Sequence, residues 1–177
     1  DTAELLNRLY TNRFDNLSVG RGRFGLMLRE DGRFLDDGVT FRVGAHQYLM
    51  SCGTGAAGVV YSHIDRLLQT EWKDLKVYLV NVSAGCATMC VCGPLAREVL
   101  QNVETDIELD EGFRFMDFRD GRLAGVPVRI ARVSYTGELS FEINVARRFA
   151  LMIWTTLMCA GEKFGITPIG SETSGVL

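Results

Sequence analysis

The sequence has no run of basic residues, no long apolar stretch and few histidines, and each shortage excludes a class of function. Lys and Arg are scattered and the formal net charge is −3, which argues against a nucleic-acid-binding groove. No apolar stretch approaches the roughly 20 residues that span a membrane, and we expect no signal peptide. The 177 residues are 47% hydrophobic and 23% charged, which is typical of one globular domain or two small lobes.

The cysteines and histidines give no sign of a metal site or a catalytic nucleophile. His46 and His63 are isolated from each other, and neither forms a readable pair with a Ser or Cys nucleophile. The sequence has an odd number of cysteines, mostly set in apolar runs: Cys52, Cys86, Cys90, Cys92 and Cys159. This pattern predicts reduced, buried thiols in a cytoplasmic protein, without a zinc site.

Hydrophobic periodicity predicts an α+β fold of helices and mostly antiparallel strands. Apolar residues recur with helical spacing over 3–10, 56–69, 94–103 and 147–162. Strands are predicted over 21–30, 33–43, 46–52, 76–82, 87–92, 113–119, 125–133 and 139–145. Asp31-Gly32 and Asp120-Gly121 are two-residue hairpin signals, and Thr167-Pro168 is a plausible helix start.

The two halves of the sequence resemble each other. Phe24–Arg33 is similar to Phe113–Arg122, and Thr40–Val43 is similar to Val128–Ala131. Such a repeat predicts two pseudo-repeated lobes, residues 1–92 and 93–177, packed around one core with a small-molecule cleft where they meet. The chain starts without Met inside a predicted helix, so we also expect a fragment of a longer polypeptide.

The stretch from Ser134 to Val145 presents a carboxylate at a fixed place. Its second half alternates apolar and polar residues, which indicates a half-buried strand with Glu142 on the polar face. A turn carrying Tyr135 precedes it. The alternative is a solvent-exposed Glu on an edge strand.

Asp37 is the most unusual acid in the sequence. It has the same strand parity as Leu35, Val39 and Phe41, whose apolar side chains should face inward. A bare buried carboxylate costs several kcal/mol, so Asp37 must be hydrogen-bonded or face a cavity. Three interpretations stay open: a ligand-facing acid, a buried capping residue, or a bulge at Gly38 that turns Asp37 to solvent.

Glu142 and Asp37 occupy similar depths in the two halves. Two acids facing one cleft, together with Tyr135, suggest a ligand with a flat ring and several N–H donors. A 2-amino-4-oxopyrimidine edge fits, because a carboxylate can accept two adjacent N–H groups while a tyrosine stacks on the ring.

Several motifs together resemble those of a known family. Tyr135-Thr-Gly-Glu-Leu-Ser-Phe-Glu142 is similar to a motif of the tetrahydrofolate-binding aminomethyltransferases, the glycine-cleavage T-protein group. Asn12-Arg-Phe14 and Gly93-Pro94 also match that group. Gly25–Gly32, Thr70–Tyr78 and Phe164–Pro168 look closer still to the folate-binding region of heterotetrameric sarcosine oxidase alpha subunits.

The resemblance implies a folate site and a one-carbon reaction. Asp37 would lie near N5 and N10 of the folate as the catalytic acid, Glu142 would hold the pterin amino edge, and Tyr135 would line the pocket. Arg132 is included with them in the implied cofactor-binding set. The enzyme would accept a one-carbon unit from oxidised sarcosine to form 5,10-methylenetetrahydrofolate, with flavin and NAD in other domains or subunits. Folate and other sarcosine oxidase subunits are the implied partners.

A second interpretation is that the chain has the same fold but no catalytic activity. In that case the chain is a non-catalytic interaction module with a vestigial pocket. One departure from the family pattern is Cys86, which stands where we expect a bulky aromatic residue.

Overall fold

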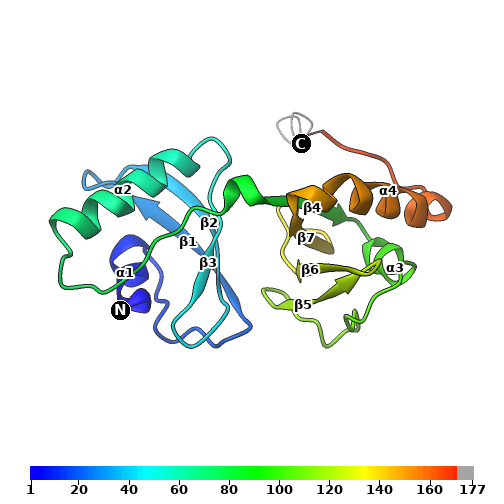
Figure 1. Cartoon of the computed structure of the whole chain (residues 1–177), viewed down its shortest axis with the longest axis horizontal. Helices are drawn as coiled ribbons and strands as arrows, with labels where there is room; N and C mark the ends of the chain where they lie inside the picture. Colours follow the sequence, from blue (N-terminus) through cyan, green and yellow to red (C-terminus); the bar gives the residue numbers. More distant parts are fainter. Residues whose placement is uncertain (171–177) are drawn as a thin grey trace. The chain divides into compact units, whose positions relative to one another are not determined.

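The computed structural model describes residues 1–170, which form two compact units (Figure 1). The first unit contains Asp1–Gly85 together with Met116–Phe118, and the second contains Cys86–Phe115 and the chain from Arg119 onward. Each unit combines helices with an antiparallel sheet, so the predicted α+β class is confirmed. No helix within residues 1–170 is long and apolar enough to cross a membrane.

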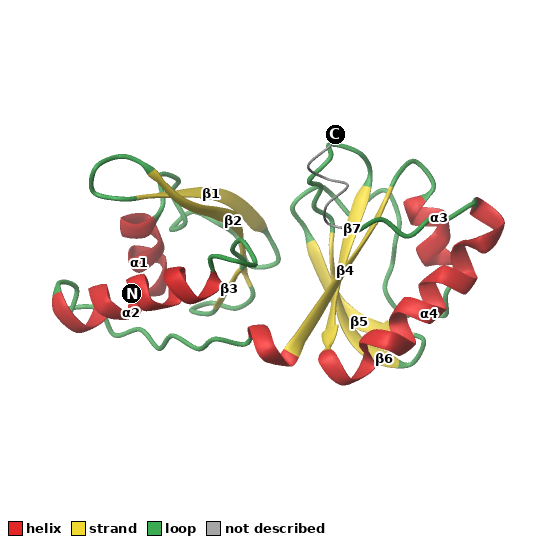
Figure 2. Cartoon of the chain, turned by 90° about the horizontal axis from the view of Figure 1, so that it is seen from above, coloured by secondary structure: helices red, strands yellow, loops and turns green. Residues whose placement is uncertain are grey.

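The first unit is a three-stranded sheet with both helices on one face (Figure 2). The strands are hydrogen-bonded in the order β1-β2-β3. Its elements follow the chain as α1 (Thr2–Leu9), β1 (Gly22–Leu28), β2 (Phe34–Arg42), β3 (Tyr48–Met50), α2 (Ala57–Thr70) and a short 3-10 helix, η1 (Ser83–Gly85). The predicted turn at Asp31-Gly32 joins β1 to β2.

Helical spacing of apolar residues explains how the helices of this unit pack. Leu5 and Leu9 of α1 lie one turn apart, as do Val60 and Ile64 of α2, and all four are buried. They form one hydrophobic cluster with Met27, which projects from β1 toward the helices. The helix-facing side of the sheet is therefore the core side of this unit.

The second unit is a four-stranded sheet with α3 and α4 on one face. The strand order is β4-β7-β6-β5, so β7 lies inside the sheet with a neighbour on each side. The elements are β4 (Cys86–Cys92), α3 (Ala96–Gln101), β5 (Phe118–Leu123), β6 (Val126–Ala131), β7 (Ser140–Ala146), η2 (Arg147–Phe149), α4 (Ala150–Gly161) and η3 (Glu162–Phe164).

Each unit has a hydrophobic core of its own, which corrects the expectation of one shared core. In the second unit, Phe141, Ile143 and Val145 of β7 are buried against Leu100 of α3 and Ile153 of α4. The first unit has a separate cluster around α1 and α2. Two separate sets of buried side chains explain why the chain divides into two units.

Two predicted strands in the connecting segments are wrong. Residues 76–82 alternate in exposure, and Val77 and Leu79 pack on the first core, but no strand within residues 1–170 pairs with this segment. In the second half, residues 113–117 form turns and a single bridge, and Asp120-Gly121 lies inside β5. The actual turn is Ala124-Gly125, where both residues have positive φ. The second hairpin prediction is therefore wrong as well.

The expectation of buried cysteines is also wrong. All five are free; Cys52 is partly buried and the other four are exposed. In β4, Ala87 and Met89 pack against the core cluster to which Val91 belongs. The cysteines of this strand occupy the alternate positions 86, 90 and 92 and therefore point to the opposite face. The predicted helix start at Thr167-Pro168 is irregular backbone, and the rest of that predicted helix falls outside the described residues.

Candidate functional site

Glu142 lies on the central strand of the second sheet, on the face opposite the helices. Its neighbours across the strands are Cys90 on β4 and Ala131 on β6. The flanking residues Phe141 and Ile143 are fully buried in the core, which fixes the direction of the strand's polar face. Glu142 is partly buried. The alternative of an exposed Glu on an edge strand is therefore wrong.

The Glu142 carboxylate has lost hydration without gaining a partner. No hydrogen bond or ion pair reaches it from any residue in 1–170. Burial raises the pKa of Glu142 above its ordinary value, because removing water disfavours the charged form. A ligand that brings N–H donors to this carboxylate would restore the lost stabilisation.

The polar side chains beside Glu142 interact with one another. The Cys90 Sγ and the Ser140 Oγ are 3.0 Å apart. Two residues further along the sheet, the Thr88 hydroxyl donates to the Asn144 Oδ1 at 2.8 Å. These pairs frame Glu142 and leave its carboxylate free to accept from a ligand.

Tyr135 and Arg132 lie in the segment that leads into β7. Tyr135 is 87% exposed, and within the described residues its ring has no aromatic or cation partner. The turn is held by the Gly137 N–H, which donates to Ser134 Oγ at 2.9 Å; Gly137 has φ +87°, which favours glycine. Arg132 is partly buried and donates from Nη1 to the Phe113 carbonyl at 3.0 Å, so one of its donors supports the fold.

Asp37 lies on the face of the first sheet that points away from the helices. It pairs across the strands with Leu26, whose side chain is 39% exposed. This face is therefore opposite the helix-packed core, which corrects the sequence expectation, although Phe41 on the same face is 4% exposed and packs edge-on against Phe118. Gly38 pairs in register with Gly25, so the predicted bulge at Gly38 is wrong as well. The irregularity comes instead between Met27 and Leu28, where Leu35 has no opposite partner.

The side chain of Asp37 is available for a ligand. It is partly buried, and no hydrogen bond or ion pair involves it within residues 1–170. Asp37 is therefore not a buried capping acid, whereas its neighbour Asp36 is one.

Asp36 is the buried capping acid that sequence reasoning missed. It is 5% exposed, and the Gly53 N–H lies 3.2 Å from each of its carboxylate oxygens. This contact ties β2 to the turn before α2. Burial, with a contribution from nearby Asp36, raises the pKa of Tyr10 to about 12. Val39 and Phe41 share the face of Asp37, so the face that carries Asp36 and Thr40 was not recognised as the helix-packed side.

The predicted meeting of Asp37 and Glu142 stays a prediction. Asp37 belongs to the first unit, whereas Arg132, Tyr135 and Glu142 belong to the second. Within the second unit, the structure places Tyr135 on the loop that enters the strand of Glu142.

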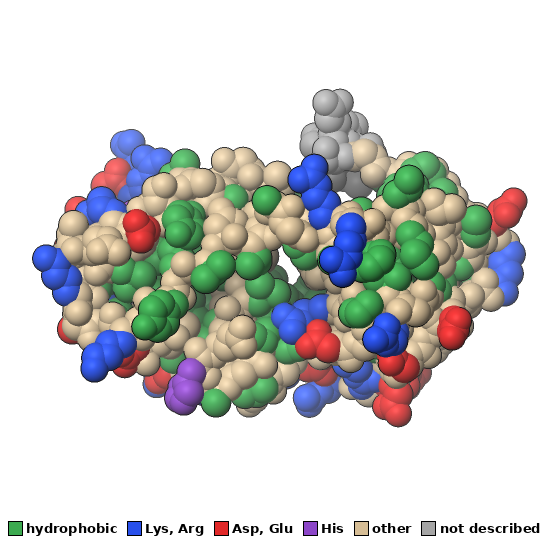
Figure 3. Space-filling model, viewed as in Figure 1, with side chains coloured by type: hydrophobic (Ala, Val, Ile, Leu, Met, Phe, Trp, Pro, Cys, Tyr) green, Lys and Arg blue, Asp and Glu red, His purple; other side chains and the backbone are tan. Residues whose placement is uncertain are grey.

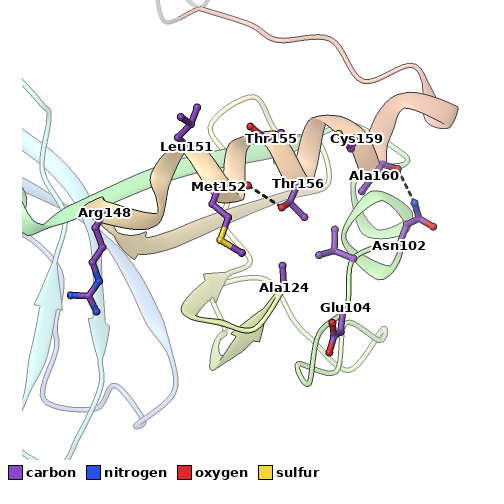
Figure 4. A pocket seen from close by; sticks show the side chains of 11 residues that line it. Asn102, Glu104, Ala124, Arg148, Leu151, Met152, Thr155, Thr156, Cys159 and Ala160 are labelled. Atoms are coloured by element: carbon purple, nitrogen blue, oxygen red, sulfur yellow. Dashed lines mark hydrogen bonds between the residues drawn. The ribbon is translucent and has the colours of Figure 1, made fainter.

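A shallow groove of about 1000 Å³ lies elsewhere in the second unit, along α4 (Figure 4). Two of its polar side chains donate to backbone: Asn102 Nδ2 to the Ala160 carbonyl at 3.0 Å, and Thr156 Oγ1 to the Met152 carbonyl at 2.9 Å. Hydrophobic side chains also reach the surface of the second unit (Figure 3). On α4, Leu151 is 77% exposed. None of the predicted site residues lines this groove, so it is not the predicted folate site.

Comparison with known proteins identifies the family to which the chain belongs. Residues 1–177 match the family model described as GCVT N-terminal domain. The sarcosine oxidase subunit alpha of Corynebacterium sp. (strain U-96) is 42% identical over 100% of this chain and 18% of its own length. An aminomethyltransferase of Geobacillus sp. (strain WCH70) is 32% identical over 96% of this chain and 45% of its own.

Solved structures share the fold. The glycine cleavage system aminomethyltransferase T from Bartonella henselae gives a TM-score of 0.73 at 21% identity, covering 88% of this chain and 40% of that one. A heterotetrameric sarcosine oxidase from Corynebacterium sp. U-96 gives 0.60 at 18% identity, covering 86% and 69%. The aminomethyltransferase-like fold is thereby confirmed, and the chain spans a minor part of the first of its curated relatives.

Adjacent acids on β2 provide a test of which one supports the fold. We expect Asp36→Ala to lower the free energy of unfolding by about 1–3 kcal/mol, because it removes the buried carboxylate that accepts the Gly53 N–H. Asp37→Ala is the matched control and should change stability by less than about 0.5 kcal/mol. Urea denaturation of both variants measures the difference. Equal losses, or a larger loss for Asp37→Ala, would contradict the assignment.

The raised pKa of Glu142 predicts a stability gain when its charge is removed. A carboxyl whose folded pKa is raised contributes stability below its unfolded pKa, and that stability is lost as the pH rises through the folded pKa. Glu142→Gln should therefore raise the melting temperature by about 1–3 °C at pH 7.5 and lose this advantage near pH 3.5. Thermal melts across this pH range provide the measurement. A destabilised variant at pH 7.5 would show that the carboxylate has a stabilising partner.

Proposed function

Since this chain belongs to the GCVT N-terminal domain family, we propose that it is the tetrahydrofolate-binding part of a sarcosine oxidase-like alpha subunit. In this proposal the enzyme accepts a one-carbon unit from oxidised sarcosine and forms 5,10-methylenetetrahydrofolate. The sarcosine oxidase alpha subunits among its relatives support this choice. Other subunits are proposed partners, and flavin and NAD sites would lie in other domains or subunits. The free cysteines support a cytoplasmic location.

The unpaired carboxylate of Glu142 is the observation that carries the proposal. It is held on a rigid central strand, it has lost water, and no residue within 1–170 compensates it. Natural proteins rarely keep such a group unless it meets a ligand or has a role in chemistry. The 2-amino and N3–H groups of a pterin are adjacent donors that one carboxylate accepts together.

The other predicted residues add to this site according to their chemistry. The exposed ring of Tyr135 offers a face on which a pterin can stack. When bound, tetrahydrofolate supplies the amine nitrogens that take up the one-carbon unit. Arg132 retains guanidinium donors beyond the one that binds the Phe113 carbonyl, and these would meet an acceptor of the ligand.

Asp37 is proposed as the acid that acts at the reacting nitrogens. Its carboxylate has no partner among the described residues, so it is available to orient an N–H group and to accept a proton from it. Fixing the nitrogen in position and holding a base within hydrogen-bond distance are the two contributions that this chain would make to transfer.

A second candidate function is an interaction module without catalysis. It is favoured by the exposed apolar side chains of α4, where Leu151, Met152 and Trp154 are 77%, 46% and 43% exposed. A surface of this kind is typical of a contact with another protein. The two candidates differ in whether the Glu142 face binds folate.

Folate binding by the intact protein tests the proposal. Isothermal titration calorimetry with 5-formyltetrahydrofolate should show binding, and Glu142→Gln should weaken it about tenfold or more, because a charge-assisted pair of hydrogen bonds is lost. Tyr135→Ala should weaken binding several-fold through the loss of stacking. Asp37→Asn should reduce the rate of one-carbon transfer more than it reduces affinity.

The control is Glu98→Gln, which removes an exposed carboxylate on α3. It should leave affinity and transfer unchanged. Absence of binding in the intact, folded protein, or equal losses in Glu98→Gln and Glu142→Gln, would favour the interaction module.

A further inference from the structure

The carboxamide of Asn144 lies on the same polar face as Glu142 and is fixed in one orientation. The two residues are separated by one position on β7, so their side chains share a face and their Cα atoms are about 7 Å apart. Thr88, directly opposite Asn144 on β4, donates its hydroxyl to Asn144 Oδ1 at 2.8 Å. This bond turns the Nδ2 amino group of Asn144 to the other side of the amide.

The Nδ2 amino group has no partner of its own. No acceptor within residues 1–170 receives its N–H groups, and Asn144 is partly buried. Its other cross-strand neighbour, Arg129 on β6, is engaged by both carboxylate oxygens of Asp120 at 2.7 and 2.8 Å. An oriented donor therefore stands beside the free acceptor of Glu142.

The order of polar groups on this face matches one edge of a 4-oxopterin. That edge carries the 2-amino group, N3–H and the 4-oxo oxygen in succession, which is two donors followed by an acceptor. A carboxylate complements the first two, and an amide N–H complements the third. A 4-amino pterin presents a donor at the last position, so it would meet the Asn144 amino group with another donor. It also carries no hydrogen on N3 and offers Glu142 one donor fewer.

We propose that Asn144, oriented by Thr88, donates a hydrogen bond to the 4-oxo group of the pterin and selects 4-oxo over 4-amino ligands. This inference rests on the proposed function, since it requires the pterin to bind at Glu142. Asn144 contacts the ligand, whereas Thr88 is a positioning residue that acts through it.

A cycle of two ligands and two proteins, the wild type and Asn144→Asp, measures the preference for the 4-oxo ligand. The ligands are folic acid and its 4-amino-4-deoxy analogue, which differ at the 4-position and, as a consequence, at N3, which carries a hydrogen only in the 4-oxo ring. The change of their affinity ratio between wild type and an Asn144 variant therefore reports the part of the selection that depends on Asn144. We expect Asn144→Asp to shift the ratio of their affinities about tenfold or more toward the 4-amino ligand, because a carboxylate accepts from the amino group and repels the oxo group.

Thr88 variants test the positioning role. Thr88→Val removes the hydroxyl and should reduce the selection for the 4-oxo ligand several-fold, whereas Thr88→Ser keeps the hydroxyl and should restore it. A structural role alone would move both affinities together and leave their ratio unchanged. Circular dichroism of each variant confirms that it is folded.

The outcomes separate this inference from the function on which it rests. If the intact protein binds folic acid through Glu142 and the affinity ratio does not change in Asn144→Asp, the inference is wrong and the proposed function stands. If neither ligand binds the intact wild-type protein, both are wrong. A shifted ratio in Asn144→Asp, with rescue by Thr88→Ser, supports the assignment.

Discussion

An ionised carboxylate that leaves water must find compensation, and this constraint separates the acids of the chain into structural and functional ones. Asp36 meets it within the fold, because the Gly53 N–H lies 3.2 Å from each of its oxygens. Glu142 does not, and burial raises its pKa. The free energy given up at Glu142 is recovered when a ligand supplies the missing donors. On this account, the desolvated Glu142 carboxylate lowers folding stability in the free protein and contributes to ligand binding in the complex.

The architecture of the second unit explains why this carboxylate stays in place. Its strand, β7, has a hydrogen-bonded neighbour on each side, and α3 and α4 cover the opposite face of the sheet. Phe141, Ile143 and Val145 anchor the strand in the core, so Glu142 and Asn144 cannot rotate to the other face without exposing them. A binding group on such a strand is more precisely held than one on a loop. Tyr135 lies on the entering loop, where a stacking ring can adjust to its ligand.

Sequence reasoning succeeded where local pattern and tertiary packing agree. The alternation from Leu139 to Val145 identified β7 and the polar face of Glu142, because a helix-covered sheet needs an apolar side. It failed where the face away from the helices is also apolar: Val39 and Phe41 share the face of Asp37, so the expected roles of Asp36 and Asp37 were exchanged. It also failed at Asp120-Gly121, where a common turn signal lies inside β5 because strand pairing outweighs local preference. Pairing partners and burial come from the whole fold, so no local window contains them.

The central claim is that Glu142 accepts hydrogen bonds from a pterin, and a structure of the intact protein with 5-formyltetrahydrofolate bound tests it most directly. The account predicts the Glu142 carboxylate oxygens at about 2.7–3.2 Å from the 2-amino and N3 nitrogens of the ring. A ring bound elsewhere, with the Glu142 carboxylate still unpaired, would contradict it.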